Sequence, residues 1–171
     1  MHQTKIGAGE TFPEIAWPTV AGDTLNPAAQ SGWRMLVVYR GRHCPICKTY
    51  LRTLNELLPE FSAAQVAVAA VSADPVEKAR ADVEQHGWTF PVGYDLQPDQ
   101  MRMLGLYISN PTSPKETNHQ FPEPGLFVIN PEGRVQIVDV SNAPFARPDL
   151  KLILSGLNFV IAHQYPIRGD A

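Results

Sequence analysis

The feature that most constrains the fold is an abrupt change of pattern that contains the only two cysteines of the chain, Cys44 and Cys47. Residues 33–39, WRMLVVY, form a short apolar run with β-branched members, which is typical of a buried strand. Gly41 closes this run, and apolar residues then recur at helical spacing as far as Phe61. The sequence therefore predicts a strand, a tight loop and a long helix, with both thiols where the helix begins.

Strands and helices alternate along the rest of the chain. Apolar runs with turn signals between them predict further strands at residues 65–72, 90–95, 125–130 and 134–140, the last two as a hairpin. Capping residues and a glycine stop predict a helix at residues 75–86, a short helix is expected at residues 97–107, and apolar residues at helical spacing predict a last helix from Pro148 onward. Such alternation is typical of an α/β layered sheet.

Two local signals qualify this pattern. Asp74 and Pro75 fit the N-cap and the first position of the helix at residues 75–86, so capping alone explains the aspartate. Residues 108–124 are too polar and rich in proline for a regular element, and we expect a long loop there. The sequence does not specify the role of this loop.

Length and composition predict one ordinary domain spanning residues 1–171. The chain is 44% hydrophobic with a net charge of −3, which indicates a folded protein and gives no reason to expect nucleic acid as a partner. The N-terminal residues lack the apolar stretch of a signal peptide, and no segment is apolar for the roughly 18 residues that a membrane helix needs. We therefore expect a cytoplasmic protein without a membrane partner, and in that compartment a close cysteine pair is usually redox-active or metal-binding.

The position of the cysteines indicates redox chemistry. Cys44 fits the N-cap and Pro45 the first residue of the helix, while Cys47 lies one turn further. Free N–H groups and the dipole at a helix start stabilise a thiolate. Nearby cationic or titratable side chains add to this effect: Arg40, Arg42, His43 and Lys48. The spacing of the two thiols lets the second attack a mixed disulfide on the first, as in thiol–disulfide exchange.

The cysteine pair has two other interpretations, inert packing and metal binding. Inert packing fits poorly with a charged corner between a strand and a helix. A structural zinc site needs four ligands. Beyond His43, the chain offers only histidines scattered without ligand spacing: His2, His86, His119 and His163. The sequence thus predicts no metal and no cofactor.

The order of elements resembles the thioredoxin fold, and three segments resemble its peroxiredoxin-like branch, the alkyl hydroperoxide reductase/thiol-specific antioxidant (AhpC/TSA) family. These segments are ETFPEIAWPTVAGDTLN, FPVGYDLQPDQMRMLGLY and GLFVINPEGRV. The resemblance covers nearly the whole chain. It implies a thioredoxin-like fold with a central mixed β-sheet flanked by helices and an N-terminal hairpin extension.

The catalytic motif of peroxiredoxins, PxxxTxxC, is altered here. Aligned with the strand, it places Arg40 at the proline, Cys44 at the threonine and Cys47 at the peroxidatic cysteine. The arginine that precedes the GLF strand in the family is replaced by Pro124, while a second family arginine matches Arg147. In thioredoxins the first cysteine occupies the threonine position and a cis-proline precedes the strand. The resemblance therefore implies a cis Glu123–Pro124 bond that docks a substrate against Cys44, with an ordinary loop proline as the alternative.

These residues lead to three functional hypotheses. The first is a thiol–disulfide oxidoreductase with an antioxidant role, in which an exposed Cys44 attacks and Cys47 resolves. The second is a peroxiredoxin-type peroxidase in which Cys47 attacks a hydroperoxide, Cys44 resolves and Arg147 stabilises the transition state. The third is a non-catalytic redox-sensing module that uses residues 108–124 as a partner surface.

The remaining candidates have open roles. His43 either tunes the thiolate or is a solvated neighbour, and Arg40 and Arg42 either bind an anionic part of the substrate or are solvated surface residues. Arg147 either reaches the dithiol or bonds to the sheet edge. The expected partners are a thiol electron donor of the thioredoxin or glutathione type and a disulfide or hydroperoxide substrate. Family members often form homodimers, so a homodimer is considered as well, but the sequence leaves the oligomeric state open.

Overall fold

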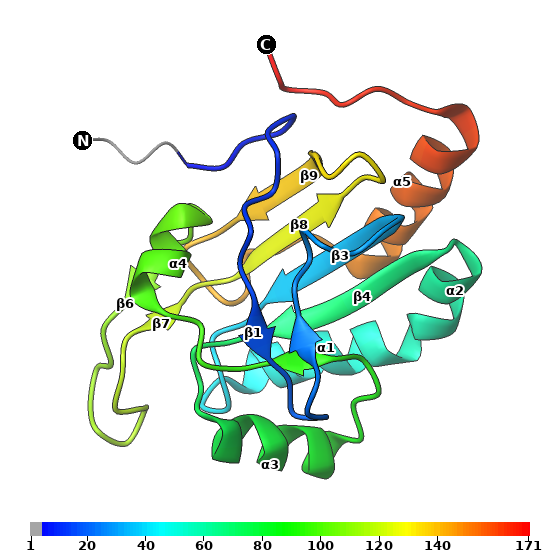
Figure 1. The fold of residues 1–171 in the computed structure, drawn as a ribbon. Coiled ribbons are helices and arrows are strands. Elements are labelled where there is room, and N and C mark those ends of the chain that lie inside the picture. The colour runs from blue at the N-terminus through cyan, green and yellow to red at the C-terminus, as the bar shows by residue number, and fades with distance from the viewer. Residues whose placement is uncertain (1–4) are drawn as a thin grey trace.

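The central feature of the fold is a mixed sheet of five strands in the order β5-β4-β3-β8-β9 (Figure 1). The computed structural model describes residues 5–171. The first three strands run parallel, and β8 and β9 are antiparallel to their neighbours. The strands are β3 (Trp33–Val38), β4 (Val66–Val71), β5 (Val92–Gly93), β8 (Gly125–Ile129) and β9 (Val135–Val140). This confirms the expected thioredoxin-like α/β fold with a central mixed sheet.

Alternate residues of each strand point to opposite faces, and helices cover both (Figure 1). The helices are α1 (Pro45–Glu56), α2 (Leu58–Ala63), α3 (Val76–His86), α4 (Pro98–Met103) and α5 (Leu150–His163). Met35 and Val37 pack into one cluster with apolar residues of α1 and α5. Leu36 and Val38 pack into a second cluster with Trp17 and residues of α4. The strand that leads to the cysteines is therefore buried on both faces, as its sequence predicts.

A short N-terminal hairpin lies over the second face. It consists of β1 (Trp17–Pro18) and β2 (Thr24–Leu25), which pair antiparallel. A bridge between Thr19 and Gly93 ties it to the main sheet. The expected N-terminal hairpin extension is therefore confirmed.

Three expectations for individual elements were wrong. The helix at residues 44–61 is divided at Leu57, because Pro59 lies in the first turn of a new helix that begins at Leu58. Residues 108–124 are not a loop throughout, since β6 (Ile108–Ser109) and β7 (Phe121–Pro122) pair and close their base. The N-cap of α3 is Pro75 and not Asp74, whose side chain is buried and bonds elsewhere.

No helix within residues 5–171 is both long and apolar enough to cross a membrane.

Candidate functional site

Both cysteines lie at the start of α1, directly beyond the end of β3. Cys44 is the N-cap, and its Sγ accepts a hydrogen bond of 3.3 Å from the backbone N–H of Cys47. Pro45 is the first residue of the helix. A backbone N–H at this position has no partner within the helix, so its absence in proline costs nothing. Both cysteines are free thiols. The helix start therefore holds the two sulfurs together in the orientation that a dithiol needs.

The pKa values of the two thiols are shifted in opposite directions. The thiol and the backbone N–H of Cys47, together with Arg40, lower the pKa of Cys44 to about 6 against the opposing effect of burial. The same thiol contact, burial and the negative charge on Cys44 raise the pKa of Cys47, against the nearby charge of Arg147. Cys44 is thus the thiolate at neutral pH, and Cys47 keeps the proton that it donates to Cys44.

The expected exposure of Cys44 was wrong. Only 1% of Cys44 and none of Cys47 is exposed, and both belong to the cluster between the sheet and α1. The N-cap position turns the Cys44 sulfur back toward the first turn of the helix, where it meets the N–H of Cys47. A disulfide substrate can therefore reach the sulfur only after a local movement of the surroundings.

Arg147 contacts the dithiol, which decides between its two expected placements. Its Nη2 lies 3.0 Å from Cys47 Sγ. Its guanidinium stacks on the ring of Tyr50 at 4.6 Å, and the Tyr50 hydroxyl donates a 2.7 Å hydrogen bond to the carbonyl of Pro148. Tyr50 on α1 thereby fixes the loop that carries the arginine. Nε and Nη1 of Arg147 are buried and have no hydrogen-bond partner within the described chain.

Arg40 lies on the other side of the pair, beside Cys44. Its guanidinium forms ion pairs with Glu123 at 3.0 Å and Glu116 at 3.7 Å, and it packs over the ring of Phe121 at 4.9 Å. Glu123 is held in turn by the hydroxyl of Ser109, which donates a 2.7 Å hydrogen bond. Sequence reasoning missed these glutamates because they stand in a polar segment without a recognisable motif.

Arg42 and His43 do not face the thiols as cationic groups. The Arg42 side chain bonds to Asp82 at 2.7 Å and to Gln85 at 3.1 Å, both on α3. The His43 ring packs edge-on against Phe121, and burial together with the charge of Arg40 lowers the pKa of His43 to about 4. Arg42 therefore links α3 to the thiol loop, residues 39–44 between β3 and α1, and His43 is neutral at physiological pH.

The expected cis bond at Pro124 was wrong, because no peptide bond within residues 5–171 is cis. The N–H of Glu123 donates to the carbonyl of Tyr107, and the carbonyl of Pro124 accepts from the N–H of Ser141. These bonds on both sides hold an extended chain that enters β8 with an ordinary trans bond. Pro124 and Arg147 line the same small cavity of about 10 Å³.

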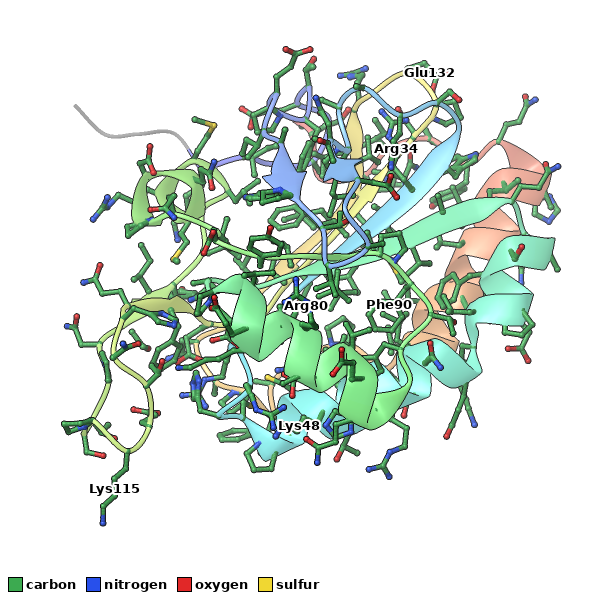
Figure 2. All side chains as sticks on the ribbon, turned by 60° about the horizontal axis from the view of Figure 1, so that its bottom comes forward. Arg34, Lys48, Arg80, Phe90, Lys115 and Glu132 are labelled. Atoms are coloured by element: carbon green, nitrogen blue, oxygen red, sulfur yellow. The ribbon has the colours of Figure 1, made fainter. Side chains whose placement is uncertain are left out.

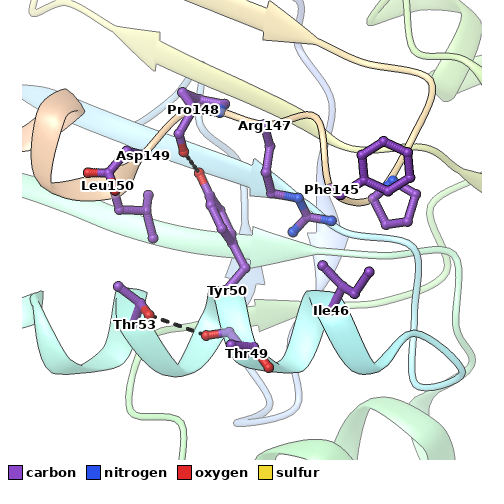
Figure 3. A pocket seen from close by; sticks show the side chains of 10 residues that line it. Ile46, Thr49, Tyr50, Thr53, Phe145, Arg147, Pro148, Asp149 and Leu150 are labelled. Carbon is purple, nitrogen blue, oxygen red and sulfur yellow. Dashed lines mark hydrogen bonds between the residues drawn. The ribbon is translucent and has the colours of Figure 1, made fainter.

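A groove of about 470 Å³ runs between α1 and the loop that carries Arg147. Figure 3 shows Ile46, Tyr50 and Thr53 on the helix side and Phe145 and Arg147 on the loop side. The lining is largely apolar, and Phe145 is 77% exposed. The groove therefore offers an apolar surface that leads to the guanidinium in contact with Cys47.

Nothing in residues 5–171 gathers three or more His, Cys, Asp or Glu side chains in a way that could hold a metal ion. Of the histidines considered as ligands, His2 lies outside the described residues.

Comparisons with known proteins agree with this arrangement. The model of the AhpC/TSA family matches residues 8–138. The thiol-disulfide oxidoreductase ResA of Geobacillus thermodenitrificans is 22% identical over 157 residues, which cover 91% of this chain and 81% of ResA. A variant of peroxiredoxin 6 from Arenicola marina shares the fold with a TM-score of 0.80 and 20% identity, over 94% of this chain and 76% of that chain. Peroxidoxin BcpB of Mycobacterium tuberculosis does so with a TM-score of 0.75 and 20% identity, over 91% and 98% of the chains.

The family match extends over most of the chain and includes both cysteines. With a redox dithiol at the start of α1, the protein is a thiol-dependent oxidoreductase, as expected from the sequence. The chain belongs to the AhpC/TSA family.

Proposed function

We propose that this oxidoreductase exchanges disulfides, with Cys44 as the attacking sulfur and Cys47 as the resolving one. The observation that carries the proposal is the hydrogen bonding at the helix start, where both the thiol and the N–H of Cys47 support a thiolate on Cys44. A thiol whose pKa lies near or below the ambient pH is ionised and able to attack.

The reaction then has two steps. The Cys44 thiolate attacks one sulfur of a substrate disulfide, forms a mixed disulfide and releases the other substrate sulfur as a thiolate. Cys47 then loses its proton and attacks the Cys44 sulfur, which forms the Cys44–Cys47 disulfide and releases the second substrate sulfur. Two electrons pass from the protein to the substrate. A thiol donor, which we propose to be of the thioredoxin or glutathione type, returns them.

Two single variants test the assignment of the sulfurs. Cys47→Ser should accumulate a mixed disulfide with a model disulfide such as oxidised glutathione, visible by mass spectrometry of the intact protein. Cys44→Ser should neither form this adduct nor reduce the substrate. The reverse result, an adduct on Cys47 alone, would assign the attack to Cys47. If neither variant loses an activity, the cysteines are not catalytic, and a redox-sensing module becomes the better account.

A second function is favoured by the contact between Arg147 and Cys47. In a peroxidase reaction, the thiolate of Cys47 attacks the terminal oxygen of a hydroperoxide, and one proton is consumed. The products are an alcohol and a sulfenic acid, which Cys44 condenses with to give the disulfide and water. Arg147 lines the apolar groove, and its buried Nε and Nη1 have no hydrogen-bond partner within the described residues, so we propose that they bond to the peroxide oxygens.

The two functions are separable with one variant. Cys44→Ser keeps Cys47 and should still consume one equivalent of hydroperoxide, leaving a sulfenic acid that dimedone labels, if Cys47 is peroxidatic. No dimedone adduct after addition of hydrogen peroxide or cumene hydroperoxide would exclude this reaction. The matched control is Cys47→Ser, which keeps the Cys44 thiolate, and its dimedone labelling should be much slower than that of Cys44→Ser if Cys47 is the peroxidatic sulfur.

We also propose a cytoplasmic location and a homodimer, in keeping with the cysteine usage of the chain and with its family. Sedimentation of the reduced protein over a range of concentrations tests the dimer, and fractionation of the source cells tests the location.

A further inference from the structure

The segment between β6 and β7, residues 110–120, packs back onto the loop that carries the thiols. Most of it is exposed, and Lys115 lies at its outer end (Figure 2). Thr117 is the exception at 3% exposed, and its hydroxyl accepts a 3.2 Å hydrogen bond from Lys78 of α3. A polar, exposed segment with few buried contacts has low local stability and opens readily. Its closed position therefore depends on a small number of specific contacts.

The main contact joins Asp74 to His119 of this segment. Asp74 is fully buried next to the thiol loop. Its Oδ2 accepts a 2.7 Å hydrogen bond from the backbone N–H of Arg42. Both carboxylate oxygens lie against Gly41, where a Cβ would be only 2.9 Å from each of them. The backbone of Gly41 and Arg42, two to three residues before Cys44, therefore holds the Asp74 carboxylate in place. Its Oδ1 has no hydrogen-bond partner within residues 5–171 and points at His119.

The other side of the contact is His119. Its Nδ1 lies 2.8 Å from the carbonyl of Gln120, and a carbonyl only accepts, so Nδ1 carries a proton. Its Nε2 lies 3.5 Å from Oδ1 of Asp74. If neither of these two atoms held a proton, an imidazole lone pair would face a carboxylate. The contact is attractive only when one proton is present between them, on the imidazole or on the carboxyl group.

We propose that Asp74 and His119 form a proton-dependent clasp that closes residues 110–120 over the thiol loop and so controls access to Cys44. The segment reaches the thiol through Arg40, since Glu116 within it and Glu123 just after it hold the guanidinium beside the Cys44 sulfur. The almost complete burial of Cys44 is what makes such a control effective. Opening the clasp frees Glu116 from Arg40 and exposes the corner at which a substrate must enter.

The direction of the pH effect follows from the groups around the pair. Asp74 is faced by Lys78 and Asp82 of α3 and by Tyr39 at the end of β3, and His43 lies near His119. Burial is the largest influence and raises the pKa of Asp74, which favours a shared proton. Removal of that proton at high pH leaves a buried carboxylate opposite a lone pair, so the clasp opens as the pH rises. At lower pH the proton is present and the clasp is closed.

Two variants act on the clasp in opposite ways. His119→Ala removes one partner and should leave the segment open at every pH. Asp74→Asn keeps an oxygen for the N–H of Arg42 and replaces the ionisable oxygen that faces His119 with an amide N–H, so the loss of closure with rising pH should disappear. Lys115→Gln, at the exposed tip of the same segment, is the matched control and should behave as the wild type.

The readout is amide hydrogen exchange of residues 110–120 in the full reduced chain, corrected for intrinsic rates, between about pH 6 and about pH 9. Wild-type protection should fall as the pH rises, and the complete loss of one hydrogen-bonded pair corresponds to about tenfold. Alkylation of Cys44 by iodoacetamide, compared with wild type at each pH, should be faster in His119→Ala at the lower pH. Hydrogen exchange reports on the clasp whether or not Cys44 exchanges disulfides.

Two results would overturn the clasp. One is equal protection of residues 110–120 in wild type and His119→Ala at the lower pH, which would mean that the pair does not hold the segment. The other is a loss of protection with rising pH in Asp74→Asn as large as in wild type, which would place the titrating group elsewhere.

Discussion

Arg40→Met tests most directly how Cys44 is kept ionised. The side chain of Arg40 is 18% exposed and supports the thiolate of Cys44. A charge pair about 4 Å apart at an effective dielectric of about 20 is worth about 4 kcal/mol, which corresponds to a change of about three in pKa. Because Glu116 and Glu123 neutralise part of this charge, we expect about half the effect. The pKa of Cys44 should then rise from about 6 to about 7.5.

The change is large enough to measure near neutral pH. At about pH 7, the ionised fraction of Cys44 should fall from about nine-tenths to about one quarter. Ultraviolet absorbance of the thiolate gives the pKa directly, and the pH dependence of alkylation by iodoacetamide gives it from reactivity. Peptide mapping of the alkylated protein confirms that the signal comes from Cys44.

A double variant separates the charge on the thiol from the ion pair. Arg40→Met alone leaves Glu123, 6% exposed, without its cation, and should lower the free energy of unfolding by about 3 kcal/mol. Adding Glu123→Gln removes the stranded charge and should restore most of this stability in urea unfolding. The pKa of Cys44 should remain above the wild-type value in both variants. An unchanged pKa in both would refute the role of Arg40 in holding the thiolate.

Three further predictions concern the same site. Arg147→Met should reduce any hydroperoxide consumption at Cys47 by about 100-fold or more, yet change disulfide reduction by less than about threefold, when both activities are measured on one preparation. Gly41→Ala should destabilise the fold by about 2 kcal/mol in urea unfolding, because Gly41 has φ +133° and a Cβ there would meet the Asp74 carboxylate at 2.9 Å. Folding lowers the pKa of Cys44, so its thiolate contributes to the free energy of unfolding. This contribution is complete above the pKa of the unfolded thiol and is lost as the pH falls through about 6. Unfolding of the reduced protein should therefore show stability that rises with pH between about 6 and about 8.5.

Local signals were sufficient to predict the frame of the site. Cys44 followed by Pro45 marks the start of a helix on its own, and the structure has this N-cap. The apolar run before it predicts a buried strand. In the structure both faces of this strand pack in the core. The contact of Arg147 with the dithiol spans 100 residues of sequence. Only the resemblance to a family could suggest it before the structure was known.

The errors arose where a long-range contact overrode a local pattern. Asp74 fits an N-cap by sequence, but the thiol loop offers its carboxylate a buried N–H of Arg42, and the cap falls on Pro75 instead. Three side chains of residues 108–124, Glu116, Glu123 and His119, contact Arg40 or Asp74, and no periodicity reveals such partners. Arg42 likewise forms an ion pair with Asp82 of α3, a partner that its place beside the cysteines in the sequence does not reveal.

Each of the two arginines stabilises negative charge on a different sulfur of the dithiol. Cys44 and Cys47 share one proton, and such coupled groups titrate as a pair. Arg40 favours the negative charge on Cys44, whereas Arg147 favours it on Cys47. Disulfide exchange needs the charge on the first sulfur and peroxide reduction needs it on the second. We therefore expect Arg40 to favour disulfide exchange and Arg147 to favour peroxide reduction, and loss of Arg40 should leave both sulfurs mostly protonated at about pH 7.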